Sequence, residues 1–205
     1  EMSASLVGSE MCIRDRLYTD IYDDSMWLIN LVENLLSVTR IEEGRLNLHI
    51  TEDLVDDVIT EALHHVNRKS VEHHITVRHK EDYLLAKMDA KLMVQVVINI
   101  VDNAIKYTPK GSNILIKTWK QGDKAVISIA DDGDGIPDEM KERVFDMFYS
   151  GANKIADSRR SLGLGLSLCR SIVNAHGGKI TVSDNTPHGT VFTITLSAGE
   201  VEIHE

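Results

Sequence analysis

The segment Val97–Pro109 constrains this chain more than any other, because polar side chains recur in it at helical spacing among apolar ones. Two amides, a cation and a phenol thereby share one face of a helix, while valines, isoleucines and an alanine cover the remaining faces. The alternative interpretation is a helix with solvated asparagines that ends at the proline. The four polar residues are Asn99, Asn103, Lys106 and Tyr107.

A second motif, Asp131–Pro137, follows an alternating apolar run at residues 124–130 that predicts a strand. Glycines after a strand allow the backbone to approach a flat ligand, and a carboxylate at the strand end can accept a hydrogen bond from an amine. Taken alone, this motif also fits an acidic turn.

A third motif, Ser161–Ser167, opens an amphipathic helix with alternating leucines and glycines. Glycines at a helix start leave backbone amides accessible, and the positive end of the helix dipole favours phosphate oxygens. The polar segment 146–162 before it is long enough to form a lid.

In this order and spacing, the three motifs resemble the ATP-binding domain of sensor histidine kinases, within the group that includes gyrase, Hsp90 and MutL ATPases. Val144–Tyr149 resembles the phenylalanine box of that family, and His188–Phe192 resembles its last glycine motif. The resemblance covers about residues 17–197, and the Kdp-type potassium-responsive sensor kinases are the most similar. It implies an α+β fold, a two-layer sandwich in which helices cover one face of a mixed, mostly antiparallel sheet.

The resemblance also implies ATP and Mg²⁺ as cofactors. Asn103 would bind Mg²⁺, since nucleotide-bound Mg²⁺ needs only one or two protein oxygens. Asn99 and Lys106 would be catalytic. Asn99 stands where hydrolysing relatives have a glutamate, and an amide cannot act as a base, which favours transfer to a protein acceptor over hydrolysis.

Other residues of the family pattern would surround the nucleotide. Asp131 would accept a hydrogen bond from the adenine amino group, and Tyr107 would pack beside the adenine or ribose. Phe145 and Phe148 are expected to anchor the base of the lid. Further nucleotide-binding residues are expected at Gly133, Gly135, Ile136, Phe148, Gly163, Leu164, Gly165, Leu166 and Thr190.

Two departures from the family pattern affect the lid. Ser161 stands where a glycine is frequent, and Ser150 stands where an arginine is frequent. Another cation would then have to approach the transferring phosphate. The candidates are Arg143, Lys154, Arg159 and Arg160.

The resemblance divides the chain into three parts: residues 1–16 as a leader outside the family, 17–45 as the second helix of a dimerisation hairpin, and 46–205 as the ATP-binding domain. An apolar stripe formed by Ile21, Leu28, Val32 and Leu35 supports the helix. All nine histidines follow that helix, so we expect the acceptor histidine to lie outside this chain, which would not autophosphorylate alone.

The pattern of the remaining chain predicts alternating strands and helices. Strands are expected at 46–50, 75–79, 84–88, 113–120, 124–130, 179–183 and 190–196. Helices are expected at 54–68, from Lys91 through the asparagine motif, at 138–144 and after the third motif.

Composition limits the partners. A net charge of −10 argues against nucleic acid and against an anionic membrane surface as the main partner. The chain has no apolar run of about 20 residues that would span a bilayer, so a membrane would be reached only through segments absent here. We expect Cys169 to be a core residue, and the histidines at 64, 65, 73, 74 and 79 to be solvated rather than metal-bound.

The function favoured by the sequence is the cytoplasmic catalytic part of a two-component sensor histidine kinase. Its expected partners are ATP, the receiver domain of a response regulator and, in the full-length protein, a second copy of the chain. A gyrase- or Hsp90-like ATPase and a non-catalytic nucleotide-binding module are the alternatives.

Overall fold

The computed structural model describes residues 47–66, 72–149 and 163–200, together with nine helical positions between Tyr18 and Thr39. The predicted leader and most of the predicted lid lie outside the described residues. The four residues of the predicted apolar stripe are helical, and their side chains are 45–54% exposed.

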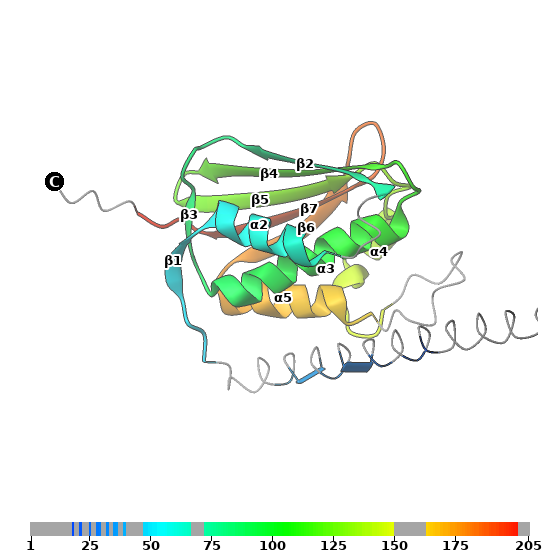
Figure 1. The fold of residues 1–205 in the computed structure, drawn as a ribbon, viewed down its shortest axis with the longest axis horizontal. Helices are drawn as coiled ribbons and strands as arrows, with labels where there is room; N and C mark the ends of the chain where they lie inside the picture. The colour runs from blue at the N-terminus through cyan, green and yellow to red at the C-terminus, as the bar shows by residue number, and fades with distance from the viewer. Residues whose placement is uncertain are drawn as a thin grey trace, which may run out of the picture.

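One layer of the domain is a five-stranded sheet with the order β2-β4-β5-β7-β6 (Figure 1). Strands β2 and β4 are parallel, and the other neighbours are antiparallel. In β7 every second side chain, from Thr190 to Leu196, is buried, as expected for a strand with one face on the core. The strands are β2 (His74–His79), β4 (Asn113–Gln121), β5 (Lys124–Asp131), β6 (Lys179–Asp184) and β7 (Thr190–Ser197).

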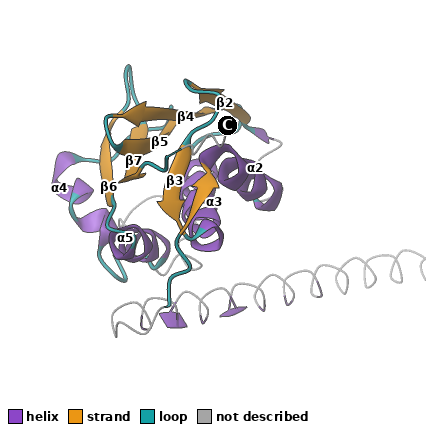
Figure 2. Cartoon of the chain, turned by 90° about the vertical axis from the view of Figure 1, so that its left-hand side faces the viewer, coloured by secondary structure: helices purple, strands orange, loops and turns teal. Residues whose placement is uncertain are grey.

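Three helices cover one face of this sheet, as the side view in Figure 2 shows. They are α2 (Val55–His65), α3 (Ala90–Tyr107) and α5 (Gly165–Ala175). The predicted α+β sandwich is therefore confirmed. Two short helices, α4 (Asp138–Lys141) and the 3₁₀ helix η2 (Arg143–Phe145), follow the segment after β5.

Helices α3 and α5 are antiparallel neighbours. Hydrogen bonds of His176 link them at the end that lies opposite the predicted site. The buried ring of His176, just after α5, donates from Nδ1 to the Ile172 carbonyl at 2.7 Å. Its Nε2 accepts from the backbone amide of Asp89, the N-cap of α3, at 2.9 Å. The end of α3 and the start of α5 consequently lie together.

The core between the layers is apolar and includes the predicted core cysteine. Cys169 is fully buried, and burial raises the pKa of its thiol to about 12, so it packs and does not react. Helix α3 contributes the largest set of buried residues: Met93, Val96, Val97, Ile100, Val101, Ala104 and Ile105.

Some predicted boundaries were wrong. No regular structure occurs at 47–50, and the strand there is β1 (Thr51–Leu54), whose register is set by antiparallel pairing with β3 (Leu85–Met88). Helix α2 ends at His65 rather than at residue 68, and the helix predicted at 138–144 is two short helices. Within the described residues, no helix is long and apolar enough to cross a membrane.

Candidate nucleotide-binding site

Helix α3 presents the predicted polar residues beside its buried face. Asn99, Asn103 and Lys106 are half-buried, and Tyr107 is 53% exposed. The Lys106 ammonium lies 5.3 Å from the centroid of the Tyr107 ring, within cation–π range. The four residues therefore do share one accessible side of the helix.

The segment Asp131–Ile136, which begins with the last residue of β5, is here called the glycine loop, and it packs against the end of α3. A Cβ added at Gly133 would lie 2.9 Å from Cγ2 of Thr108 and 3.5 Å from the Tyr107 carbonyl oxygen. A side chain at this position would collide with Thr108. The second predicted motif thus reaches the helix of the first, and the half-buried Ile136 packs against the core.

The carboxylate of Asp131 is held by the backbone. Its Oδ1 accepts from the amide of Gly133 at 3.0 Å and from the amide of Thr190 at 3.1 Å. Burial raises the pKa of Asp131, and these two amides oppose the shift by stabilising the charged form. The structure thus brings together Asp131 and Thr190, which the sequence analysis had placed in separate motifs.

The start of α5 meets α3 beside Asn99. A Cβ added at Gly165 would lie 3.6 Å from Oδ1 of Asn99, an ordinary contact. The first helical hydrogen bond of α5 is donated by Leu168 to Leu164, so the amides of residues 165–167 have no acceptor inside the helix. Leu164 is buried and Leu166 is half-buried, so these two side chains pack rather than face solvent.

The amide nitrogen of Asn99 points into the core beside this contact. Nδ2 is buried and has no oxygen or nitrogen partner within the described part of the chain, and the polar group it faces is the buried thiol of Cys169, a weak acceptor. A buried donor with only a weak acceptor costs free energy.

The segment before the lid is anchored by one of the two predicted phenylalanines. Phe145 is buried, and its ring makes an edge-to-face contact with Phe192 at 6.1 Å between centroids. Phe148 was expected to anchor the lid as well, and this was wrong: its side chain is 61% exposed. The guanidinium of Arg143, one of the candidate phosphate-binding cations, stacks on the Tyr149 ring at 4.6 Å from the ring centroid. In this position Arg143 is engaged with the ring.

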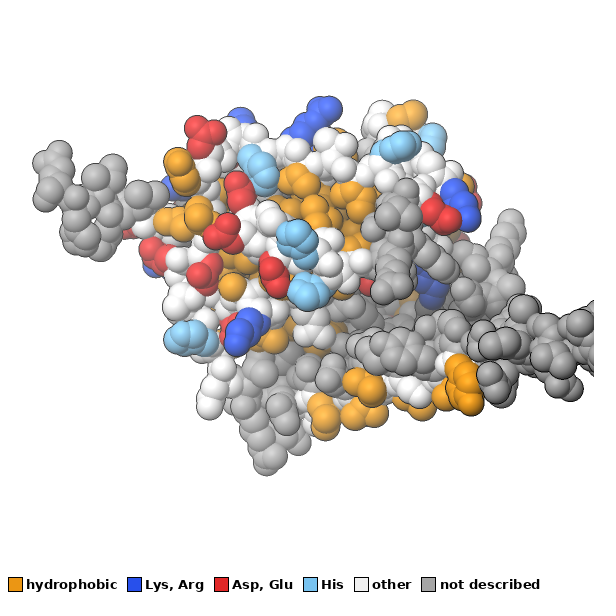
Figure 3. Space-filling view, viewed as in Figure 1, with side chains coloured by type: hydrophobic (Ala, Val, Ile, Leu, Met, Phe, Trp, Pro, Cys, Tyr) orange, Lys and Arg blue, Asp and Glu red, His pale blue; other side chains and the backbone are white. Residues whose placement is uncertain are grey.

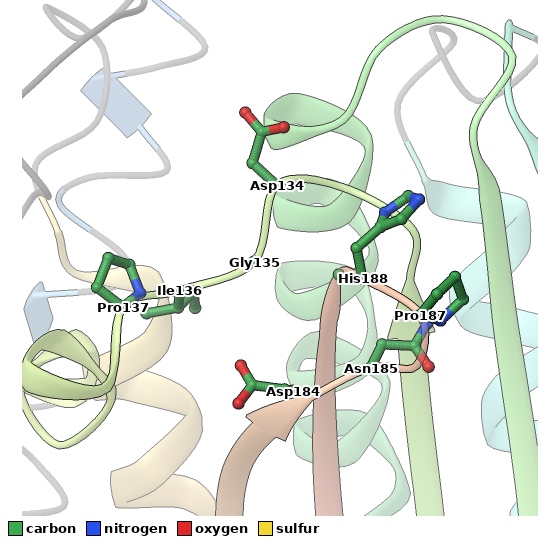
Figure 4. Close-up of a pocket in the computed structure, with 9 residues that line it drawn as sticks. Asp134, Gly135, Ile136, Pro137, Asp184, Asn185, Pro187 and His188 are labelled. Atoms are coloured by element: carbon green, nitrogen blue, oxygen red, sulfur yellow. The ribbon is translucent and has the colours of Figure 1, made fainter.

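A cavity of about 340 Å³ lies between the glycine loop and the β6–β7 turn, which is formed by residues 185–189 (Figure 4). Gly135 and Ile136 line it, but none of the four polar residues of α3 does. The cavity is therefore separate from the face of α3 that carries the amides.

Two residues of the β6–β7 turn hold the glycine loop. Asn185 was missed by the sequence analysis, and His188 was placed in the last glycine motif without being given a role. Nδ2 of Asn185 donates to the Asp131 carbonyl at 2.7 Å, and Nδ1 of His188 lies 3.1 Å from the Gly133 carbonyl. A short polar stretch between two predicted strands signals only a turn. No local pattern shows that this turn contacts a loop more than fifty residues earlier.

The surface around α2 and β1 carries acidic and histidine side chains. On the face in Figure 3 they lie among apolar groups, and the Lys and Arg side chains are separated from one another. The described residues on this face therefore form no continuous basic surface. Within the described part of the chain, no three His, Cys, Asp or Glu side chains are placed to hold a metal ion.

Comparison with known proteins gives consistent matches. The family described as histidine kinase-, DNA gyrase B-, and HSP90-like ATPase matches residues 88–200. Sensor protein KdpD of Clostridium acetobutylicum is 41% identical over 183 residues, which are 89% of this chain and 20% of that protein. The chain thus spans about a fifth of the length of this curated relative.

Solved structures show the same fold. Histidine kinase AdeS of Acinetobacter baumannii has a TM-score of 0.74 at 24% identity, covering 90% of this chain and 85% of that one. Histidine kinase ThkA, solved in complex with the response regulator protein TrrA, has a TM-score of 0.64 at 28% identity, covering 82% and 48%. The chain therefore belongs to the family of histidine kinase-, DNA gyrase B- and HSP90-like ATPases and contains the catalytic domain of a sensor histidine kinase.

Proposed function

We propose that this chain binds Mg²⁺ and ATP and transfers the γ-phosphate to a histidine on a dimerisation hairpin, for onward transfer to the receiver domain of a response regulator. One observation carries the proposal: the glycine loop and the start of α5 meet the same helix, α3, with Gly133 at Tyr107 and Gly165 at Asn99. A carboxylate, an amide face and the amino end of a helix consequently lie around one end of α3.

The residues present fit a nucleotide-bound Mg²⁺. Asn103 is half-buried, and its side chain makes no hydrogen bond within the described part of the chain, so its amide oxygen is available as a single ligand. The metal would neutralise phosphate charge. Lys106, on the same face, would add a second positive charge near the phosphates.

The base end and the phosphate end follow from the same geometry. The amides of Gly133 and Thr190 both donate to Oδ1 of Asp131, which leaves Oδ2 to accept from the adenine amino group. The amides of residues 165–167, which have no acceptor inside α5, would bind phosphate oxygens. Gly135, Gly163, Leu164, Leu166 and Phe148 would complete the surroundings of the nucleotide.

Asn99 supports transfer over hydrolysis. An amide cannot remove a proton from water, whereas an imidazole nitrogen needs no such base to attack phosphorus. In the proposed step a P–N bond forms, the bond between the γ-phosphorus and its bridging oxygen breaks, and ADP leaves. Catalysis then consists of positioning and charge stabilisation.

The acceptor and its partners belong to the longer protein. We propose residues 17–45 as the second hairpin helix, because its described apolar residues are helical and exposed at heptad-like spacing. A homodimer would pair two hairpins. The complex of ThkA with the response regulator protein TrrA supports a response regulator as partner. We propose that the chain is the cytoplasmic part of a membrane-anchored sensor kinase.

Incubation with Mg²⁺ and γ-labelled ATP tests the proposal. Alone, the chain should gain no acid-labile phosphohistidine and should hydrolyse ATP slowly. With the native hairpin supplied in trans, the hairpin histidine should be labelled. Rapid hydrolysis without a hairpin would favour the ATPase alternative, and tight ATP binding with no transfer to the native hairpin would favour a non-catalytic module.

A further inference from the structure

We propose that Asn185 is a positioning residue for base recognition: from the β6–β7 turn it fixes Asp131 in the orientation that accepts the adenine amino group. His188, on the same turn, holds the glycine loop at Gly133. The inference rests on the proposed role of Asp131. It concerns two residues that contact the glycine loop.

The side chain of Asn185 is itself held at both ends. Its Nδ2 donates to the Asp131 carbonyl at 2.7 Å, and its Oδ1 accepts from the Thr186 amide at 2.9 Å. The opposite orientation of the amide would place oxygen against oxygen and N–H against N–H, so these partners select one orientation. Its own backbone amide donates to the Gly189 carbonyl at 3.0 Å, which closes the turn.

The same turn binds the carboxylate of Asp131. The Thr190 amide donates to Oδ1 at 3.1 Å, while Asn185 binds the carbonyl of the same residue. Gly189 makes this approach possible, because a Cβ there would lie 2.0 Å from the Asp131 carbonyl oxygen. The β6–β7 turn and the residue after it therefore hold both the main chain and the side chain of Asp131.

His188 fixes the middle of the glycine loop. Its Nδ1 lies 3.1 Å from the Gly133 carbonyl oxygen. A carbonyl can only accept, so Nδ1 carries the hydrogen. Gly133 in turn donates its amide to Oδ1 of Asp131, and displacement of Gly133 would release one of the two amides that orient the carboxylate.

These contacts predict an effect on base preference rather than on nucleotide affinity in general. A hydrogen bond weakens steeply when its angle departs from linearity, so a reoriented carboxylate would lose the amino group of adenine. A nucleotide without that amino group has no such bond to lose. Purine riboside triphosphate, which lacks the 6-amino group, is therefore the comparison ligand.

Calorimetric titration of the whole chain with ATP and with purine riboside triphosphate tests the inference. Asn185→Asp keeps the shape but replaces the donor with an acceptor facing a carbonyl. We expect ATP to bind about five- to tenfold more weakly and purine riboside triphosphate to bind as before. Asn174→Asp, the same change at an exposed position on α5, should alter neither affinity.

A second pair of variants covers the case in which Asn185→Asp does not fold. His188→Ala should reduce the preference for ATP, and His188→Asn, whose amide can replace Nδ1–H, should restore it. Equal losses for both nucleotides, or a preserved preference for ATP in Asn185→Asp and His188→Ala, would overturn the positioning role alone. An unmodified chain that binds ATP with no preference over purine riboside triphosphate would overturn the adenine role of Asp131 as well.

Discussion

The two ends of the proposed nucleotide site are built in opposite ways. At the base end, the Asp131 carboxylate and carbonyl, the Gly133 carbonyl and the Thr190 amide are all paired with one another or with the β6–β7 turn. At the phosphate end, the amides of residues 165–167 have no acceptor inside α5.

This difference shows which part of the site has its hydrogen bonds formed before the nucleotide binds. At the base end, the orientation of Asp131 and of the glycine loop is already fixed by hydrogen bonds in the free protein, so this end can select a base by fixed geometry. The phosphate end has helix-start amides without an acceptor inside α5, which an anion would satisfy, so we expect binding there to be driven by charge and by pairing of these donors. The following variants test this distinction, beginning with the largest expected effect.

Gly163→Ala should damage the phosphate end most. Gly163 has a φ of +66°, and a Cβ there would lie 2.4 Å from the backbone oxygen of Tyr149 and 2.7 Å from its nitrogen. Because backbone cannot yield as a flexible side chain does, the start of α5 must move. We expect ATP affinity to fall by about a hundredfold or more, measured by calorimetry.

Gly177→Ala is the matched control for that variant. Gly177 has the same φ of +66°, but an added Cβ would meet nothing within 4 Å. It should lower the free energy of unfolding by about 1 kcal/mol and leave ATP affinity unchanged. Similar ATP affinities for the two variants would show that the start of α5 does not bind phosphate.

Asn103→Ala should abolish the part of ATP affinity that depends on Mg²⁺. The side chain is half-buried on α3, so its removal takes away a metal ligand without opening a core cavity. Calorimetric titrations with Mg²⁺ and with a chelator measure the difference, and thermal unfolding checks the fold. An unchanged effect of Mg²⁺ would remove Asn103 from the site.

Asp131→Asn should weaken ATP binding at least tenfold, since a charge-assisted hydrogen bond contributes about 1.5–3 kcal/mol. Its effect on stability should have the opposite sign. Burial raises the folded-state pKa of Asp131, so the favourable contribution of its protonated form is lost as pH rises through that pKa. A variant that cannot titrate avoids this loss.

The pH dependence checks that sign. Without nucleotide, the difference in melting temperature, Asp131→Asn minus unmodified chain, should become more positive between about pH 4 and about pH 7. A difference that becomes more negative would mean that the ionised carboxylate stabilises the free base end. Retained ATP affinity would refute the adenine role.

Asn99→Ala should have the smallest effect on stability. In the absence of nucleotide, removal of an unpaired buried donor should leave the free energy of unfolding unchanged or raise it by up to about 1 kcal/mol. ATP affinity should fall in the same variant. Urea unfolding measures the first quantity, and a loss of about 2 kcal/mol or more would show that the Asn99 amide is already satisfied in the free protein.

The sequence predicted the helices, the large sheet and the phosphate end better than it predicted β1 and the base end. Periodicity placed α3, α5 and the strands of the large sheet, because each buries one face and its pattern is local. It misplaced β1, whose position depends on pairing with Leu85–Met88 and not on its own residues. Most of the phosphate end was predictable too, since glycines and a helix start are adjacent in the chain.

The base end was predictable only in part. Asp131 stood out as an acid after a strand, whereas Asn185 did not, and His188 stood out only as the first residue of the last glycine motif. Their contacts with the glycine loop could not be predicted, because their partners lie more than fifty residues away in the chain. The exposure of Phe148 was missed for a related reason. An apolar side chain next to a buried one is expected to be buried, and only the positive φ of 63° and the exposed surface show otherwise.

Amide hydrogen exchange with and without Mg²⁺ and ATP tests the contrast between the two ends most directly. In the free chain, the amides of Gly133 and Thr190 should be protected, and those of Gly165, Leu166 and Ser167 should exchange rapidly. Nucleotide should slow the second group strongly and the first only slightly. Rapid exchange of Gly133 and Thr190 in the free chain, or no slowing at residues 165–167 on binding, would contradict a completed base end and an open phosphate end.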